Sequence, residues 1–238
     1  MKSLIKSFSP TFQQRRRGLF CILFIGFIIF VWDLGSTGLV DETPPLFAAA
    51  SRAMAETGNW LTPQVNGLPR FDKPPLVYWL MGIGYSIPGH DFLDPLGTWA
   101  ARLPSALSTI CLMLVLGDTI MRYPQEENHF NRRTAIIAAM AFAFSPLVII
   151  WGRIAVSDAL LCSTLGICLL FQWRRYANPE REVWWLSWFF LSLAVLTKGP
   201  VALVLSGLTI FFFAVFQNDL INIIKILKVI PGLFIVLT

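Results

Sequence analysis

Long apolar runs without a charged residue alternate with short polar connections along most of the chain. Six such runs are complete, and a seventh begins near Val229 and stops at Thr238. The six are Gly18–Trp32, Leu103–Gly117, Thr134–Gly152, Ala159–Trp173, Val183–Thr197 and Gly199–Asn218. A helix needs about 20 residues to cross about 30 Å of hydrocarbon, so the shorter runs must recruit flanking residues or thin the bilayer. The pattern predicts an all-α integral membrane protein, a multi-span helical bundle of six spans and a partial seventh.

One more apolar run, Pro74–His90, raises the question of whether it also crosses. It begins with two prolines and contains three glycines and a third proline, which disfavour a regular helix. If this run does not cross, 13 of the 19 Lys and Arg residues fall on the same side as residues 1–17. If it crosses, that asymmetry is lost. The positive-inside rule therefore predicts a re-entrant or interfacial segment and a cytoplasmic N-terminus, residues 1–17.

Composition narrows the class of protein further. Hydrophobic residues make up 55% of the chain and charged residues 14%, with a mean hydropathy of +0.64. These values exclude a soluble domain and a disordered tail. The net charge of +5 comes from basic residues scattered between apolar runs, so we expect membrane lipids and no nucleic acid as partners. Residues 18–238 are expected to form one transmembrane domain with an extracytoplasmic loop, residues 33–101, in a bacterial inner membrane.

The long outer loop is predicted to contain an interfacial helix, Pro44–Thr57. Thr43 followed by proline is a typical helix start, and Gly58 is a good helix stop. One face of this helix carries Phe47, Ala50 and Met54. A helix with such a face suits the plane of the membrane interface.

Charged residues stand next to turns in this loop. Asp41 and Glu42 directly precede the predicted helix, where exposed backbone donors favour ionised carboxylates. In the segment Asn66–Pro75, Asn-Gly and the prolines impose turns and hold Lys73 in an extended stretch before the apolar run. A lysine in that place can meet a lipid phosphate.

The two later outer connections, Arg153–Asp158 and Thr197–Pro200, are short and also charged. The six apolar runs themselves contain no acidic or basic residue, whereas carriers usually place such residues near the middle of the bilayer. No glycine-rich cradle for a soluble nucleotide-sugar is present either. Any chemistry is therefore expected at the outer interface, where an isoprenoid carrier presents a phosphoryl-sugar.

The chain resembles the membrane glycosyltransferases of GT-C fold that use polyprenyl-phosphate sugars, in particular the aminoarabinose transferases, which are related to protein O-mannosyltransferases. The resemblance is carried by motifs in order over residues 41–200. They are Asp41-Glu42-Thr43, Thr57-Gly58-Asn59-Trp60-Leu61-Thr62-Pro63, Asn66-Gly67, Phe71-Asp72-Lys73-Pro74-Pro75-Leu76, Tyr78-Trp79, Ala101-Arg102-Leu103-Pro104, Val156-Ser157-Asp158 and Leu196-Thr197-Lys198-Gly199-Pro200.

The resemblance implies transfer of a sugar from a polyprenyl-phosphate carrier to an acceptor hydroxyl or phosphate, as in lipid A modification. Such a reaction needs a base for the acceptor and a cation for the departing phosphate. Asp41 is expected to be the base or the carboxylate that orients the acceptor, with Asp158 as a second catalytic carboxylate. Lys73 is expected to bind the phosphate. Further substrate contacts are expected from Glu42, Arg70, Arg153 and Lys198. The family can bind a divalent metal ion, for which Asp72 is the candidate ligand.

Two departures from the family pattern affect these expectations. Pro44-Pro45 stands where the family often has a polar pair, which concerns the acceptor contacts, and Asp72 stands where glutamate is common, which shortens the reach to a metal. The chain also ends within an apolar run, so we expect a fragment or truncated product that lacks the C-terminal part of the family. The acceptor is expected to be a glycolipid, a glycan or a protein. A membrane transporter or lipid flippase without sugar transfer is the alternative function.

Overall fold

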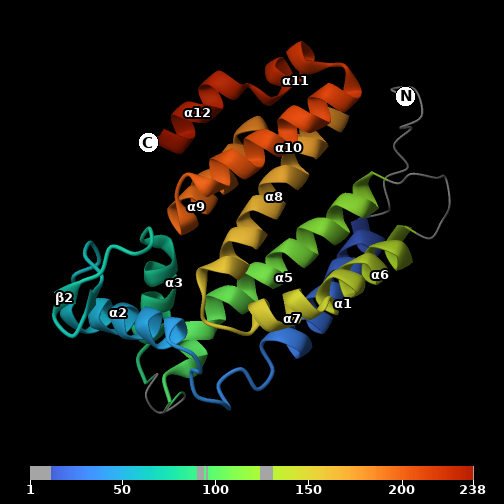
Figure 1. The fold of residues 1–238 in the computed structure, drawn as a ribbon. Coiled ribbons are helices and arrows are strands. Elements are labelled where there is room, and N and C mark those ends of the chain that lie inside the picture. The colour runs from blue at the N-terminus through green and yellow to red at the C-terminus, as the bar shows by residue number, and fades with distance from the viewer. Residues whose placement is uncertain (1–11, 90–93, 95, 124–130, 238) are drawn as a thin grey trace.

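The computed structural model describes residues 12–89, 94, 96–123 and 131–237, which form a helical bundle with one small hairpin (Figure 1). The helices are α1 (Phe12–Phe30), α2 (Thr43–Thr57), α3 (Leu76–Tyr85), α5 (Thr98–Arg122), α6 (Asn131–Ala143), α7 (Pro146–Gly152), α8 (Ser157–Ala177), α9 (Trp184–Lys198), α10 (Val201–Gln217), α11 (Leu220–Leu227) and α12 (Val229–Leu237). The strands are β1 (Gln64–Val65) and β2 (Leu68–Pro69).

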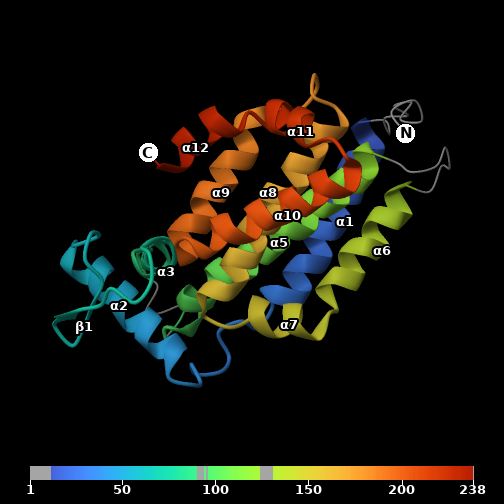
Figure 2. The same ribbon diagram turned by 45° about the horizontal axis from the view of Figure 1, so that its top comes forward.

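Helix α5 stands at the centre of the bundle. It packs against α1 and α6 on one side and against α8 on the other, and α9 continues the layer beyond α8 (Figure 2). Every apolar run predicted as a span contains a helix, so the all-α expectation is confirmed, with the two short strands as the exception. Helix α1 begins six residues before the predicted Gly18, because the arginines there continue the helix and Arg15 reaches Asp118 of α5. Residues 1–11 of the predicted cytoplasmic segment lie outside the described residues.

The predicted run Thr134–Gly152 is a broken helix. Its two halves, α6 and α7, meet at an angle of 72°. Pro146 lacks a backbone N–H and disfavours a helical conformation at the preceding residue, and Ser145 is accordingly extended with ψ of 129°. By length and hydropathy, the described residues contain one helix able to cross a membrane, α5, or up to three if each bent pair counts as one span. The six spans and the partial seventh therefore stay a prediction.

The predicted loop helix is present as α2, and it ends at Gly58 with a left-handed φ of 72°. Two details differ from the expectation. Glu42 occupies the N-cap position and Thr43 is already helical, because the two following prolines supply helical φ angles at the first turn. The apolar face is not turned to lipid. The side chains of that face, Phe47, Ala50 and Met54, are all buried in a cluster with residues of α3.

The Asn-Gly dipeptide forms the predicted turn. Asn66 and Gly67 have φ of 53° and 76°, as the tight turn of a two-residue hairpin requires, and they connect β1 to β2. The chain then enters α3, which covers ten residues of the predicted segment Pro74–His90. His90 lies outside the described residues.

Helices α2 and α3 with the hairpin lie together at one end of the bundle, here called the loop end (Figure 1). The rings of Phe47 and Tyr78 pack with their centroids 5.2 Å apart. Ala155, from the connection between α7 and α8, and Leu160, from the start of α8, belong to the same buried cluster. The cluster therefore joins the starts of α2, α3 and α8, and the charged residues that precede these helices come to the same end of the molecule.

Candidate functional site

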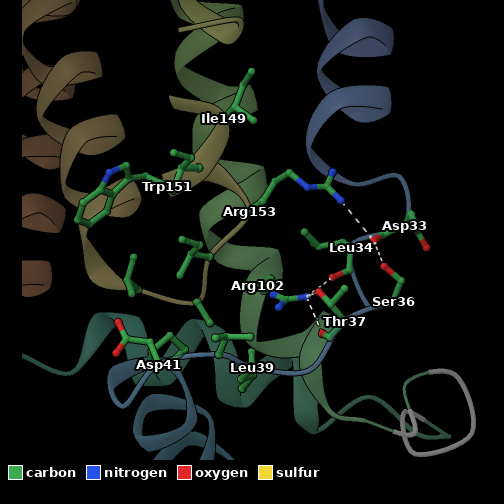
Figure 3. A pocket seen from close by; sticks show the side chains of 16 residues that line it. Asp33, Leu34, Ser36, Thr37, Leu39, Asp41, Arg102, Ile149, Trp151 and Arg153 are labelled. Atoms are coloured by element: carbon green, nitrogen blue, oxygen red, sulfur yellow. Dashed lines mark hydrogen bonds between the residues drawn. The ribbon is translucent and has the colours of Figure 1, made fainter. Parts of the chain in front are cut away.

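A cavity of about 680 Å³ opens at the loop end between the segment that follows α1 and the connection from α7 to α8 (Figure 3). Its polar lining includes Asp33, Asp41, Arg102 and Arg153, and Trp151 contributes an aromatic wall. The cavity thus combines two carboxylates, two guanidinium groups and apolar side chains. This combination suits a substrate with a polar head and an apolar body.

Asp41 lies at the turn from the segment after α1 into α2. Its backbone has a left-handed φ of 79°, and its Oδ1 accepts a hydrogen bond of 2.8 Å from the backbone N–H of Glu42. Asp41 is exposed and lines the cavity. Glu42 is exposed as well, but it is not among the residues that line the cavity.

Arg153 is held by the C-terminal end of α1. Its guanidinium group donates to the carbonyl oxygen of Ile29 at 2.6 Å, and to that of Trp32 at 3.1 Å from both terminal nitrogens. It also donates to the carbonyl oxygen of Asp33 at 3.3 Å. A cation in this place satisfies carbonyl groups that the end of a helix leaves without partners. The substrate contact expected of Arg153 stays a prediction, and the structure gives it a helix-capping role.

Lys73 belongs to a compact charged cluster before α3. Its Nζ donates to Oδ1 of Asp72 at 3.1 Å, and Nη2 of Arg70 donates to Oδ2 of the same carboxylate at 3.1 Å. All three side chains are partly exposed. The cluster therefore carries a net positive charge in a partly exposed position, which suits a phosphate group.

Two buried polar atoms at this cluster have no hydrogen-bond partner among the described residues. One is Nε of Arg70, within the cluster, and the other is the hydroxyl of Tyr78, in α3. Burial raises the pKa of the Tyr78 hydroxyl, and the nearby Arg70 guanidinium opposes that rise. Native proteins rarely leave such donors unpaired, because each costs about 1–3 kcal/mol of desolvation. Both groups can donate to an anionic ligand.

Asp158 lies in the first turn of α8 and forms an ion pair with Lys198, the last residue of α9. The carboxylate takes no part in capping α8, whose N-cap is Val156. Asp158 also lines an apolar cavity of about 470 Å³ between α5, α7, α8 and α10. A methyl group at Gly199 would stand 3.9 Å from Cγ of Pro74. The Asp158–Lys198 pair is thus brought close to the segment that carries Lys73.

The structure assembles the predicted site residues into three groups at the loop end. Arg153 shares a cavity with Asp41, Asp158 pairs with Lys198, and Arg70 and Asp72 surround Lys73. Lys73 does not line the cavity of Asp41.

Asp72 was the candidate metal ligand. Both of its oxygens accept from cations, and no three His, Cys, Asp or Glu side chains gather around one point among the described residues. These residues alone do not fit a divalent ion.

Arg102 is the site residue that the sequence did not reveal. It stands in the motif Ala101-Arg102-Leu103-Pro104, but a single arginine at the start of an apolar run gave no sign that it reaches back to the segment after α1. It is 9% exposed and lines the cavity beside Asp41. The sequence offered one indication: Arg102 belongs to a motif of the family resemblance to which no role had been assigned.

Residues 72–238 match the family described as dolichyl-phosphate-mannose-protein mannosyltransferase. An uncharacterized protein of Aquifex aeolicus is 33% identical over 195 residues, which cover 80% of this chain and 41% of that protein. The undecaprenyl phosphate-alpha-4-amino-4-deoxy-L-arabinose arabinosyl transferase of Shewanella sediminis is 26% identical over 208 residues, which cover 83% of this chain and 35% of that protein.

Two crystal structures of ArnT from Cupriavidus metallidurans have the same fold. The apo state is 25% identical with a TM-score of 0.77, and the match covers 91% of this chain and 39% of ArnT. The state bound to undecaprenyl phosphate is 24% identical with a TM-score of 0.72, with coverages of 90% and 40%. The chain therefore spans about two fifths or less of the length of these proteins. Together, the matches confirm the resemblance carried by the motifs between residues 41 and 200.

Proposed function

Because the chain belongs to the dolichyl-phosphate-mannose-protein mannosyltransferase family, we propose that it acts as a membrane glycosyltransferase with a polyprenyl-phosphate sugar as donor. The related arabinosyl transferase is named for an undecaprenyl-phosphate sugar, and ArnT has been crystallised with undecaprenyl phosphate. Both names support a lipid-phosphate donor for this chain.

One observation carries the proposal: the residues before α2, before α3 and at the start of α8 meet at the loop end. The shared buried cluster and the approach of Gly199 to Pro74 bring these segments together. Carboxylates and cations from distant parts of the chain are thereby placed at the mouths of cavities with apolar walls. A lipid-linked sugar has a charged phosphate and an apolar tail. It therefore needs charged side chains and an apolar surface next to each other.

In the proposed reaction, the acceptor oxygen attacks the anomeric carbon of the donor sugar. The bond between that carbon and the phosphate oxygen breaks, and the electron pair leaves with the polyprenyl phosphate. The proton of the acceptor hydroxyl passes to the carboxylate of Asp41, or to that of Asp158. The leaving phosphate gains one negative charge, which the cations near it stabilise without protonation.

The departing phosphate is assigned to the cluster before α3. Lys73 supplies an ammonium group, and the unpaired Nε of Arg70 and hydroxyl of Tyr78 supply two further donors. Asp72 holds the two cations in place from the other side. The acceptor, a glycolipid, a glycan or a protein, is assigned to the cavity of Asp41, with Glu42 at its edge.

We further place the chain in a bacterial inner membrane, with the six predicted spans and the loop end on the extracytoplasmic side. Residues 33–101 then form the outer loop, and the basic residues of the opposite end face the cytoplasm. This orientation follows the positive-inside rule.

The test uses the full-length protein reconstituted in vesicles with an undecaprenyl-phosphate sugar donor and a lipid A acceptor. Asp41→Asn and Lys73→Ala are each expected to lower sugar transfer by at least about 10²-fold, by loss of a catalytic carboxylate or of a phosphate ligand. Glu180→Gln, an exposed residue between α8 and α9, is the control and should retain full transfer. Transfer that survives both substitutions would refute the proposal, and movement of the lipid carrier without transfer would favour the flippase.

A further inference from the structure

The segment between α1 and α2 contains no regular structure, yet main-chain contacts fix it along its length. Thr98 of α5 donates to the carbonyl oxygen of Gly35 at 2.9 Å, and Ser36 donates to that of Asp33 at 3.1 Å. The segment leads directly to Asp41, which has the left-handed backbone described above. The position of the Asp41 carboxylate therefore depends on how this segment is held.

Arg102 makes further contacts with this segment. Nη1 donates to the carbonyl oxygens of Leu34 at 2.8 Å and Thr37 at 2.9 Å, and approaches Oγ1 of Thr37 at 3.1 Å. Nη2 donates to the carbonyl oxygen of Gly38 at 2.8 Å. Figure 3 shows the Arg102 side chain directed at this segment. One guanidinium group thus ties three residues of the segment, 34, 37 and 38, to the rigid central helix α5.

The chemistry of arginine explains why this residue type is required. A guanidinium group presents five N–H donors in a planar fork, whereas an ammonium group is a compact point donor on a flexible stem. Lysine could approach one of the three carbonyl groups but could not hold all of them in one geometry. Arg102 is also nearly buried, so water competes little for these hydrogen bonds.

We propose that Arg102 is a positioning residue for Asp41: it clamps residues 34–38 and so fixes the Asp41 carboxylate at the cavity. This inference rests on the proposed function, in which Asp41 takes part in sugar transfer. Arg102 lines the cavity assigned to the acceptor, but its guanidinium group donates to the carbonyl oxygens of Leu34, Thr37 and Gly38. It acts only through the main chain of the segment.

The first measurement is turnover by the full-length protein in vesicles. Arg102→Ala and Arg102→Lys are both expected to lower kcat by about 10²-fold, the loss expected when a reacting group is displaced by about 1 Å. KM for the donor should not change, because the cluster of Lys73 is left intact. The matched controls are Arg52→Ala and Arg52→Lys, in an outer arginine of α2 that stacks on Tyr85 at 5.1 Å. The controls are expected to retain wild-type kcat.

The second measurement reports the position of the segment without activity. Nitroxide labels are placed at Val40 and Phe71, whose side chains are 78% and 79% exposed, in a background with the four cysteines replaced by alanine. Double electron–electron resonance should give a narrow distance distribution in the otherwise unchanged protein. Arg102→Ala should broaden it, and Arg52→Ala should not. Arg102→Lys, which keeps the charge, serves if Arg102→Ala does not fold.

Unchanged kcat in both Arg102 variants overturns the inference. Lower kcat with unchanged donor KM and a broadened distribution supports it. An unchanged distribution overturns it, whatever happens to kcat, and so does a rise in donor KM that accounts for the loss of turnover. Sugar transfer that survives both Asp41→Asn and Lys73→Ala would instead refute the proposed function, whereas the label distances would still show whether Arg102 holds the segment.

Discussion

Lys198, at the end of α9, forms an ion pair with Asp158 in the first turn of α8. Both side chains remain about one third exposed, at 28% and 36%. A pair this exposed contributes little to stability, typically about 0–1 kcal/mol. Asp158 lines an apolar cavity, and Gly199, next to Lys198, approaches the segment of Lys73. We therefore expect the pair to orient the Asp158 carboxylate in the proposed reaction.

The pair should therefore behave differently in stability and in turnover. Lys198→Ala is expected to lower the free energy of unfolding by less than about 1 kcal/mol but to lower kcat by about 10-fold or more. Asp158→Asn should lower kcat further. Because the two groups act together, the double variant should lose less than the product of the two single losses. Multiplicative losses in this double-mutant cycle would show that the two side chains act independently.

The opposite end of the bundle holds a buried charge network that the sequence did not reveal. Asp118 of α5 accepts a hydrogen bond of 3.0 Å from Arg174 of α8. It also forms ion pairs with Arg122, whose Nε lies 2.9 Å from Oδ2, and with Arg15 of α1. Arg174 is only 2% exposed. A single carboxylate thus pairs with cations from three helices, and Glu182 supplies a second carboxylate to Arg122 at 3.3 Å.

Asp118→Asn should be strongly destabilising, because it leaves the buried Arg174 without its anionic partner. The expected loss is about 3–5 kcal/mol of unfolding free energy, measured by thermal unfolding in detergent. Glu180→Gln, in the exposed connection between α8 and α9, is the matched control and should change stability by less than about 0.5 kcal/mol. Equal stability of the two variants would mean that the network contributes nothing.

The positions of the helices could be predicted from the sequence because apolar periodicity and helix-stop residues act locally. Gly58 ended α2 as expected, and Asn66-Gly67 formed its turn. The partners of Arg102 and Asp118 could not be predicted. These residues reach carbonyl or charged groups that lie far away in the sequence, and only the packing of α1, α5 and α8 decides which groups they meet.

The Tyr78 hydroxyl has no hydrogen-bond partner among the described residues. Its removal is therefore expected to change donor binding without changing stability. Tyr78→Phe removes no hydrogen bond within the described residues, so the thermal midpoint should stay within about 1 °C of the wild type. If the hydroxyl donates to the donor phosphate as proposed, KM for the donor should rise about 10-fold, the usual worth of a hydrogen bond to a charged group. A large drop in the thermal midpoint with unchanged KM would contradict both parts.

Tyr123, which follows the last residue of α5, makes the protein sensitive to alkali. Burial raises the pKa of its hydroxyl above the ordinary value of 10.0, and the hydrogen bond of 2.8 Å to Oε1 of Glu182 raises it further. The folded state therefore favours the neutral phenol. Its contribution to stability is complete below pH 10 and is lost as the pH rises from 10 toward the folded-state pKa, by at most about 1.4 kcal/mol per pH unit.

Unfolding in detergent between pH 8 and pH 11.5 tests this dependence, and Tyr123→Phe is the variant for comparison. The wild type should lose stability above pH 10 more steeply than Tyr123→Phe, because the variant has no phenol to ionise in the unfolded state. Subtraction of the two curves removes the common effect of lysine titration. The difference between the curves should be flat below pH 10 and should fall above it. A difference that stays flat to pH 11.5 would show that the Tyr123 hydroxyl ionises equally easily in the folded and unfolded states.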